Sequence, residues 1–480
     1  MMEGLPGELV QIFQQTPALN HAYLVGGCVR DWLLGIANKD FDVEVFGISY
    51  EQLVEALKPW GRTDLVGRSF GVVKLTVRSG LTFDFTIPRR DSKIAPGHKG
   101  FEITFDPGIT PKEAAARRDF TINSLMYDPR RQEVLDFFDG LADLRNRVLR
   151  HTSEAFVEDP LRVLRGMQLA GRFSLSAAPE TVDLARSMKA ASPELAIERI
   201  REEWFKWAAK SATPSAGLKF LAATEWLEHF PEIQALQGTP QEPEWHPEGD
   251  VFTHTCHCCD ALVTLPAWQS ADEESRIVYS FATLAHDFGK AHTTQSALKN
   301  GELRLISPGH EEVSVALAEV FLSRMRVPEA IVNRVLPLVR NHMAHLQEVT
   351  DRSVRRLAKR LEPENIQGLS VVMTADSMGR PPLPRRVPEI VTALQAKAAE
   401  LQVQASAPKP ILMGRHLLEL GMKPGPEVGV ILEAAFNAQL EGAFFDLKQA
   451  LEWLAHQEEL KVPDAVRSAL KASKLKTPVE

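Results

Sequence analysis

Apolar and polar residues alternate in short runs through about the first 147 residues, and this alternation predicts strands between short helices. HAYLVGG (21–27) is a short apolar run ended by two glycines, and VRDWLLG (29–35) has helical spacing. FDVEVFG (41–47) alternates strictly. GVVKLTV (71–77) and LTFDFTI (81–87) predict a hairpin closed by a Ser-Gly turn. The front of the chain is therefore expected to contain a mixed sheet.

Beyond about residue 150 the strand pattern fades, and segments rich in Leu, Ala, Glu and Arg predict a remainder that is nearly all helix. Proline, glycine and polar residues gather near 237–250, 379–389 and 407–410, where breaks are expected. The predicted fold class is α+β, with a mixed-sheet head followed by helical parts. Four parts are expected: a head (1–147), a helical neck (148–228), a second helical domain (229–388) and a helical tail (389–480).

Composition narrows the class of protein. The chain has 480 residues, of which 44% are hydrophobic and 25% charged, so it is globular rather than disordered. No apolar run is long enough to span a membrane, and the first residues do not read as a signal peptide. Three of the four cysteines (Cys28, Cys256, Cys258 and Cys259) crowd together, which favours a reducing cytoplasm over a disulfide framework. A net charge of -8 argues against indiscriminate nucleic-acid binding but allows a local basic surface.

The first candidate chemistry lies on the predicted strand at 41–47. Asp40 and Asp42 are two residues apart, so both side chains leave the same face of a strand. Two such carboxylates repel each other unless cations lie between them, and two metal ions could activate a hydroxyl and stabilise a leaving phosphate. Asp84, between two phenylalanines on the hairpin, is the best candidate for a third carboxylate. Taken alone, such a pair more often marks the polar face of an edge strand.

The string GGCVRD (26–31), followed by LLG and KDFD (39–42), resembles the opening motif of the tRNA nucleotidyltransferase and poly(A) polymerase family, in its bacterial and eukaryotic class. The resemblance implies a polymerase-β-like head that binds Mg²⁺ through Asp40 and Asp42, with Asp84 as a further catalytic residue. It implies nucleotide contacts at Gly26, Gly27 and Arg30, CTP and ATP as substrates, and the tRNA acceptor arm as partner. A glycine turn between strand and helix also suits phosphate.

A second stretch, RRDFTINSL (117–125), resembles the family's RRDFTxNAL element, with Ser124 where alanine is usual. Arg117 and Arg118 are expected to hold triphosphate, because guanidinium pairs with phosphate oxygens in a fork. The resemblance implies ribose selection by Asp119 and Asn123. Without it, Arg-Arg-Asp would read as a solvated turn. Between the two motifs, RRDSKIAPGHKGF (89–101) is either an ordinary mobile loop or the family's loop for switching from C to A addition.

The neck carries a motif that resembles the family's EDxxR element. Asp159 and Arg162 could imitate a Watson–Crick edge without a template, and Arg165 is expected to contact nucleotide as well. The rival interpretation is local, since Asp159 before Pro160 also looks like a helix N-cap. Glu158 belongs to the same element, and a further family motif, DGxxDLxxxxxR, is matched by Asp139, Gly140, Asp143, Leu144 and Arg150. The family's ERxxxExxK motif is matched by Glu198, Arg199, Glu203 and Lys206, most of which are expected to be structural. A basic strip for RNA is expected at arginines 145, 147, 150, 162 and 165, although several could simply pair with nearby acids.

The middle of the chain suggests a second chemistry. His254, His286-Asp287 and Asp376 follow the H…HD…D order of the HD phosphohydrolase superfamily, and imidazole and carboxylate suit a divalent metal whose identity stays open. Lys290, His310 and His342 are candidate accessory residues. One subgroup of the tRNA nucleotidyltransferase family carries such a domain, which implies 2′,3′-cyclic phosphodiesterase, 2′-nucleotidase and phosphatase activities. Residues 256–259 are expected to pack within a helix rather than to bind zinc.

The expected function is template-independent addition of CCA to tRNA, with RNA-end hydrolysis by the HD domain. The segment 411–442 resembles the helical tail of bacterial members, and we expect it to help hold the tRNA body. Three alternatives remain open: an A-adding, CC-adding or poly(A)-adding enzyme; a phosphohydrolase that uses the head as an RNA clamp; and a non-catalytic RNA-binding protein. The sequence does not decide the oligomeric state.

Overall fold

The computed structural model describes residues 4–37, 40–64, 71–93, 101–106, 108–346, 348–463 and 466–468. It contains two compact units. The first is Met1–Gln234 with Ser323–Arg326, and the second is Ala235–Leu322 with Val327–Glu480. The division into four parts with bounds at 147, 228 and 388 stays a prediction.

The head is built on a mixed seven-stranded sheet, as the sequence predicts, with strand order β3-β4-β5-β2-β1-β8-β9. Every neighbouring pair is antiparallel except β2 and β5, which run parallel. The strands are β1 (Ala22–Val25), β2 (Asp42–Val45), β3 (Gly61–Asp64), β4 (Val72–Val77), β5 (Thr82–Thr86), β8 (Met126–Asp128) and β9 (Glu133–Leu135). The predicted hairpin is confirmed as β4–β5.

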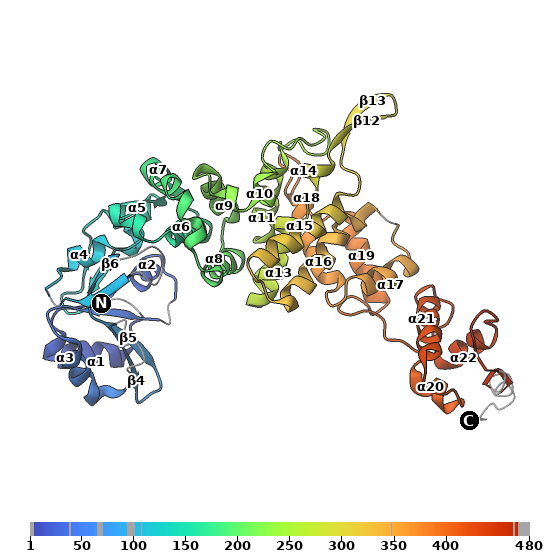
Figure 1. Ribbon diagram of the computed structural model, residues 1–480, viewed down its shortest axis with the longest axis horizontal. Coiled ribbons are helices and arrows are strands. Elements are labelled where there is room, and N and C mark those ends of the chain that lie inside the picture. Colours follow the sequence, from blue (N-terminus) through green and yellow to red (C-terminus); the bar gives the residue numbers. More distant parts are fainter. Residues whose placement is uncertain are drawn as a thin grey trace. The chain divides into compact units, whose positions relative to one another are not determined.

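Alternation along the central strands separates an apolar face from a polar one. Val43, Val45, Leu75 and Phe85 are completely buried, so this face forms the head's core. The helices α1 (Gly7–Gln15) and α3 (Tyr50–Leu57) lie together in Figure 1, and α3 contacts β3 and β4. Three short helices complete the head: α2 (Gly27–Leu33), α4 (Pro111–Ala116) and α5 (Gly140–Arg145). The opposite face of β2 and β5 is left for polar side chains.

The neck is helical and packs tightly on α6. Its helices are α6 (Leu161–Phe173), α7 (Pro179–Ser187), α8 (Ile197–Lys210) and α9 (Pro214–Ala223). A Cβ at Gly166 of α6 would collide with the rings of Phe220 and Phe120, at 2.8 and 3.0 Å, so a glycine there lets α6 approach both rings. Two short parallel strands, β10 (Val148–Leu149) and β11 (Ser176–Ala177), also lie in this region.

The second unit begins with a bundle of helices. The short helix α10 (Pro231–Gln234) still belongs to the first unit. The bundle helices are α11 (Val251–Leu262), α12 (Pro266–Gln269), α13 (Glu273–Ala285), α14 (Lys290–Thr293), α15 (His310–Arg324), α16 (Glu329–Asn341), α17 (Asp351–Arg360), α18 (Ile366–Met378) and α19 (Glu389–Glu400). Helices α11, α13 and α18 contact one another and form its centre. Among the described residues, no helix is both long and apolar enough to cross a membrane.

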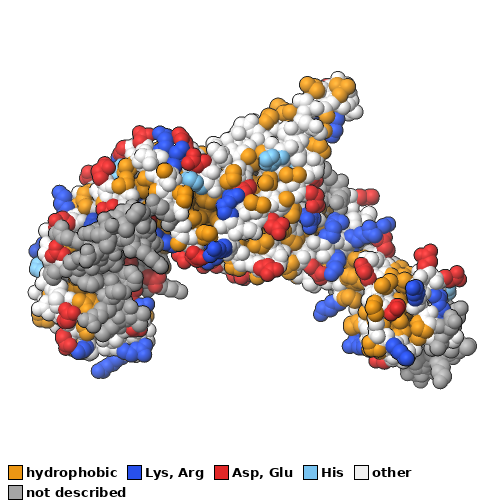
Figure 2. All heavy atoms as spheres, in the orientation of Figure 1, with side chains coloured by type: hydrophobic (Ala, Val, Ile, Leu, Met, Phe, Trp, Pro, Cys, Tyr) orange, Lys and Arg blue, Asp and Glu red, His pale blue; other side chains and the backbone are white. Residues whose placement is uncertain are grey.

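The expectation that nearly everything beyond residue 150 is helix is confirmed, with β11 and one hairpin as exceptions. Strands β12 (Gln295–Lys299) and β13 (Glu302–Ile306) pair antiparallel and extend away from the helices (Figure 1). Asn300 and Gly301 form the turn with φ of 53° and 85°, the left-handed pair that an Asn-Gly turn supplies. Leu298 and Leu303 are 75% and 73% exposed, and Figure 2 shows hydrophobic side chains at the hairpin's end.

The tail has its own small core. Helices α20 (Gly414–Glu419), α21 (Pro426–Leu440) and α22 (Leu447–Ala455) bury Leu417, Ile431 and Leu454 together. Arg352 and Arg356 of α17 form ion pairs with Glu441 after α21.

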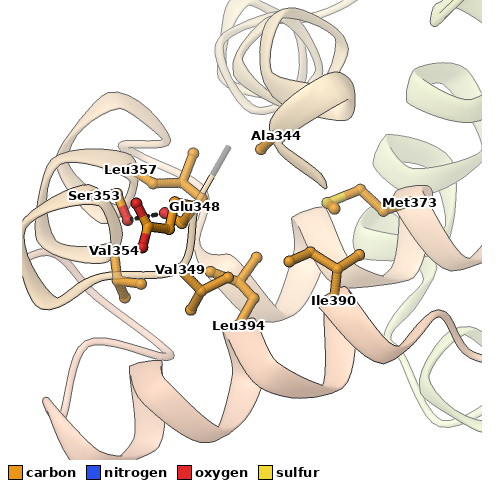
Figure 3. Close-up of a pocket in the computed structure, with 9 residues that line it drawn as sticks. All are labelled: Ala344, Glu348, Val349, Ser353, Val354, Leu357, Met373, Ile390 and Leu394. Atoms are coloured by element: carbon orange, nitrogen blue, oxygen red, sulfur yellow. Dashed lines mark hydrogen bonds between the residues drawn. The ribbon is translucent and has the colours of Figure 1, made fainter. Parts of the chain in front are cut away.

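Between α17, α18 and α19, apolar side chains converge on a cavity of about 10 Å³ (Figure 3). That volume accommodates about one water molecule, so the cavity is a packing gap rather than a ligand site.

Two candidate active sites

The parallel pairing of β2 with β5 brings two of the predicted head carboxylates together. Asp42 lies directly opposite Asp84 in the register, on strands that are about 4.8 Å apart. Asp40 lies two residues before Asp42, and its charge acts on Asp42. Burial raises the pKa of Asp42, and the charges of Asp84 and Asp40 raise it further against the opposing effect of Arg118.

One of these carboxylates, Asp84, has a buried oxygen without a hydrogen-bond donor among the described residues. This oxygen is Oδ1, and its nearest cation is Lys74 at 3.8 Å. Crowded acceptor oxygens on the polar face of a sheet fit a divalent cation, which would relieve their mutual repulsion. The three predicted residues thus meet the chemical requirement for a metal site.

Sequence reasoning missed a fourth acid on the same face. Glu44 follows Asp42 by two residues, and Arg118 Nη2 lies 3.1 Å from its carboxylate. The strict alternation of the strand could have identified it. Arg118 also lies beside Gly26, where φ is 74° and any Cβ would approach Arg118 Nη1 closely. The glycine turn therefore leaves space for a guanidinium next to the acidic face.

Four predicted residues form one buried chain of polar contacts that joins the head to the neck. Arg30 Nη1 donates to Asn123 Oδ1, and Asn123 Nδ2 donates to Asp119 Oδ1 at 3.0 Å. Arg165 Nε of α6 donates to Asp119 Oδ2 at 2.7 Å. Burial alone would raise the pKa of Asp119, but Arg165 and Asn123 outweigh it and hold the pKa below its usual range. Asp119 is therefore ionised and fixed, which suits a residue that positions its neighbours.

The two neck residues proposed to read the base are both held in place. Asp159 Oδ1 accepts from the Leu161 N–H at 3.0 Å, and Asp159 Oδ2 accepts from Arg199 Nη2 at 2.8 Å. Arg162 donates to the backbone carbonyls of Ala155 and Arg117. The capping contact is thus present, and Arg199 adds a contact that capping does not require. Arg117 itself lies 3.7 Å from Glu158.

The predicted basic strip is largely engaged with the chain's own acceptors. Arg147 donates to the carbonyl of Phe173, and Arg150 pairs with Asp143 and Glu180. With the contacts of Arg162 and Arg165, four of its five arginines have internal partners. Of the segment proposed for the C-to-A switch (89–101), the beginning forms β6 (Arg89–Lys93), which pairs antiparallel with β7 (Phe101–Phe105), and residues 94–100 lie outside the described residues.

All the predicted HD residues converge within the second unit. Asp287 lies at the centre, with its carboxylate 3.3 Å from His286 Nε2, 3.3 Å from His310 Nε2, 3.7 Å from His254 Nε2 and 3.8 Å from His342 Nε2. Asp376 of α18 lies 3.1 Å from His254 Nε2. These side chains come from five segments, α11, the end of α13, α15, the end of α16 and α18.

In each histidine of this centre, a contact of Nδ1 fixes the ring so that Nε2 faces Asp287. The Nδ1 atoms of His286, His310 and His342 donate to the carbonyls of Thr283, Ser307 and Val339. His254 Nδ1 instead lies 2.7 Å from the carboxylate of Glu248. Fixing Nδ1 in this way orients Nε2 for a metal ion, an arrangement typical of metal-bound histidines.

The charges of this centre are set by burial and by mutual contact. Burial alone would raise the pKa of Asp287, but His286 and Lys290 outweigh it and keep the carboxyl ionised. Burial lowers the pKa of His342 to about 3, so its imidazole is neutral. His286 Nε2 and both Asp287 oxygens are buried, and their close contacts with one another and with Lys290 and His310 are ion pairs rather than hydrogen bonds. Such a donor set fits one or two divalent metal ions.

A cavity of about 690 Å³ opens onto this centre. Asp287, His310 and His342 line it, together with the cations Lys290, Arg380 and Arg304, of which Arg304 is paired with glutamates. Trp245, which is 57% exposed, also lines it. The cavity can therefore receive a phosphate beside the HD residues and present an aromatic ring to a base.

Two residues of this centre were not predicted. Glu248 accepts from both His246 and His254, at 2.9 and 2.7 Å. Cys258, expected to pack within its helix, lies 3.3 Å from His254 Nε2. Cys256 and Cys259 are buried, and none of the four cysteines forms a disulfide. The spacing of four between His254 and Cys258 is the signal that could have found the second contact.

Comparisons with known proteins agree with this division. The poly A polymerase head domain matches residues 22–150, and the HD domain matches residues 251–378. A multifunctional CCA protein of Xanthomonas oryzae is 35% identical over 434 residues, covering 88% of this chain and 98% of that protein. One of Xylella fastidiosa is 36% identical over 373 residues, covering 75% and 84%.

Solved structures show the same fold. The Bacillus stearothermophilus CCA-adding enzyme in complex with CTP has a TM-score of 0.62 and 20% identity, covering 94% of this chain and 97% of that one. The Thermotoga maritima CCA-adding enzyme complexed with tRNA has a TM-score of 0.58 and 19% identity, covering 94% and 96%. With its nucleotidyltransferase head and HD domain, and with relatives aligned over nearly their whole length, the chain belongs to the family of multifunctional CCA proteins.

Proposed function

We propose that this protein adds C, C and A to the 3′ end of tRNA from CTP and ATP, without a nucleic-acid template, in the cytoplasm. The observation that carries the proposal is the parallel register of Asp42 with Asp84 on a polar sheet face beside Arg118. In the reaction, the tRNA 3′-hydroxyl attacks the α-phosphate and pyrophosphate leaves. Family membership supports this assignment.

Each head residue has a defined part in the proposal. Asp40, Asp42 and Asp84 hold the divalent metal, Mg²⁺ in our assignment, which when bound would lower the pKa of the attacking hydroxyl and offset phosphate charge. Arg118 and Arg117 bind triphosphate oxygens, with Arg118 leaving Glu44 to do so. The chain from Arg30 to Arg165 keeps Asp119 and Asn123 in place for the ribose.

The assay that tests this proposal uses tRNAs truncated before C74, after C74 and after C75 (numbering of the tRNA), each with CTP, ATP, GTP or UTP singly and Mg²⁺ or Mn²⁺. We expect CMP to enter the first two and AMP the third. AMP alone, CMP alone or a long A tract would instead identify the A-adding, CC-adding or poly(A) alternative. If no nucleotide is incorporated into any of these tRNAs, the result would support the alternative of a phosphohydrolase that uses the head only to hold RNA.

Base choice depends on Asp159 in our proposal, and Asp159→Asn separates that role from capping. Asparagine caps a helix as well as aspartate, so the Leu161 contact survives. The partly exposed pair with Arg199 contributes only about 0–1 kcal/mol. We therefore expect an unchanged melting temperature with at least about tenfold weaker discrimination of CTP against UTP in steady-state kinetics. The comparison variant is Asp159→Ala, which removes the contact with Leu161. If Asp159→Asn discriminates CTP from UTP like wild type, and only Asp159→Ala lowers the melting temperature, Asp159 serves as a helix cap.

We further propose that the HD domain hydrolyses 2′,3′-cyclic and terminal phosphates of RNA. His254, His286, Asp287 and Asp376 would hold the metal, which supplies an activated water and polarises a phosphoryl oxygen. Lys290, 2.7 Å from Asp287 and at the cavity wall, and Arg380 would bind phosphate. His310 and His342 face the same carboxylate oxygen of Asp287, where they could hold a second ion.

Glu248 acts on this metal through His254. The pKa of Glu248 is about 2, because hydrogen bonds from His246 and His254 outweigh its burial, so it is anionic. Glu248→Gln keeps the shape and removes the charge that makes His254 a better ligand. We expect metal affinity to fall about 10–100-fold, measured by calorimetry with Zn²⁺, while CCA addition is unchanged. Equal affinity in the variant would mean that Glu248 serves only the local fold.

A further inference from the structure

Cys258 is buried against the HD centre rather than merely within its helix. It follows His254 by one turn of α11, so both side chains leave the same face of the helix. Its Sγ lies 3.3 Å from His254 Nε2 and 3.7 Å from the carbonyl of Asp376. Gly379 has no side chain where a Cβ would collide with this sulfur, so the end of α18 leaves room for the thiol.

The sulfur completes a set of four ligand atoms. One atom each from His254, Cys258, His286 and Asp376 lies within 4.8 Å of all the others. A tetrahedral ion with bonds of about 2.3 Å to sulfur and about 2.0–2.2 Å to nitrogen and oxygen would place its ligands roughly 3.3–3.6 Å apart. The observed 3.3 Å between Cys258 and His254 and 3.1 Å between His254 and Asp376 are close to these edges.

A second observation indicates that this set awaits a ligand. His286 is 1% exposed, and its Nε2 makes no hydrogen bond to any described residue. Its Nδ1 is committed to the carbonyl of Thr283, and its Nε2 lies 3.3 Å from the Asp287 carboxylate without a hydrogen bond to it, so the inward nitrogen keeps its lone pair for a ligand. A buried, oriented and unsatisfied imidazole nitrogen beside a thiol and a carboxylate is a donor set for a metal ion.

We propose that Cys258 supplies a thiolate ligand to the metal ion of the HD centre and biases that centre toward thiophilic ions such as Zn²⁺ over Mg²⁺ or Mn²⁺. This inference rests on the metal centre proposed above. On binding, the sulfur–hydrogen bond breaks, sulfur forms the bond to the metal, and the proton leaves to solvent. Asp287, next to His286, remains available to the same ion or to the His310–His342 side.

Cobalt is a suitable probe, because Co²⁺ with a thiolate ligand shows a sulfur-to-metal charge-transfer band in the near ultraviolet. The full chain, freed of metal, is titrated with Co²⁺ as wild type, Cys258→Ser and the matched control Cys256→Ser. We expect the band in wild type and in the control, and its loss in Cys258→Ser. Nucleotide addition by the same preparations reports that the rest of the chain is intact.

Metal preference gives a second readout that does not involve catalysis. Competition titrations should show Cys258→Ser losing at least about tenfold in Zn²⁺ affinity and much less in Mn²⁺ affinity, since a hydroxyl replaces a soft donor. Co²⁺ bound without the band, or a band that persists in Cys258→Ser, overturns the thiolate ligand. No Co²⁺ binding overturns the metal centre and this ligand with it. A band without cyclic-phosphate hydrolysis supports the ligand and removes only the proposed activity.

Discussion

Asp42→Asn is expected to abolish CCA addition without destabilising the fold. The amide has almost the same shape as the carboxylate but no charge, so it is a much weaker ligand for a divalent metal ion. We expect the rate of CMP and AMP incorporation to fall at least about 100-fold, equivalent to ~2.7 kcal/mol. The measurement is single-turnover incorporation of labelled nucleotide into truncated tRNA.

The stability part of this expectation follows from the raised pKa of Asp42. A carboxyl whose pKa is higher in the folded state than in the unfolded state makes folding less favourable as pH rises through these values. Above these values the carboxylate of Asp42 therefore opposes folding, and its neutral replacement should melt no earlier. Glu44→Gln is the matched control on the same strand face, with a smaller loss expected because Glu44 pairs with Arg118. More than a tenth of the wild-type rate in Asp42→Asn would contradict the assignment.

Asp287→Asn is expected to abolish hydrolysis of 2′,3′-cyclic phosphates while nucleotide addition stays near wild type. Asp287 contacts His286, His310 and Lys290, so removing its charge removes the central anion of the HD centre. We expect a loss of at least about 100-fold in hydrolysis of a cyclic-phosphate-ended RNA. Both activities and metal content are measured on one preparation.

Removing a buried anion also leaves Lys290 without its nearest carboxylate, which can weaken folding. His342→Gln avoids that difficulty, because His342 is neutral and its removal takes away no charge. We expect it to reduce hydrolysis with little change in melting temperature. Unchanged hydrolysis in both variants would refute the HD assignment, and a parallel loss of nucleotide addition would mean that Asp287 supports the fold.

Strand alternation and short motifs were sufficient to predict the head and the HD residues. In FDVEVFG the strict period of two identifies which side chains leave the buried face, and in the HD region the order of His, His-Asp and Asp is enough to select four residues that meet. Both patterns work because the chemistry needs these groups on regular elements, where spacing determines direction.

The parts that could not be predicted depend on contacts between distant segments. Nothing near Glu248 in sequence indicates that it receives two imidazoles. The hairpin β12–β13 was missed although its Asn-Gly turn was visible, since Lys, Leu and Glu around it suit a helix as well. The internal partners of the basic strip likewise come from other elements.

The buried chain from Arg30 through Asn123 and Asp119 to Arg165 has a consequence for protein engineering. A chimera that takes its first 150 residues from one relative and its neck from another would divide this chain between two parents. Each parent supplies a partner shaped for its own counterpart, so a mismatch would leave a buried ionised carboxylate without its cation. Heads and necks in this family should therefore be exchanged as one piece, with no grafting boundary between Arg30 and Arg165.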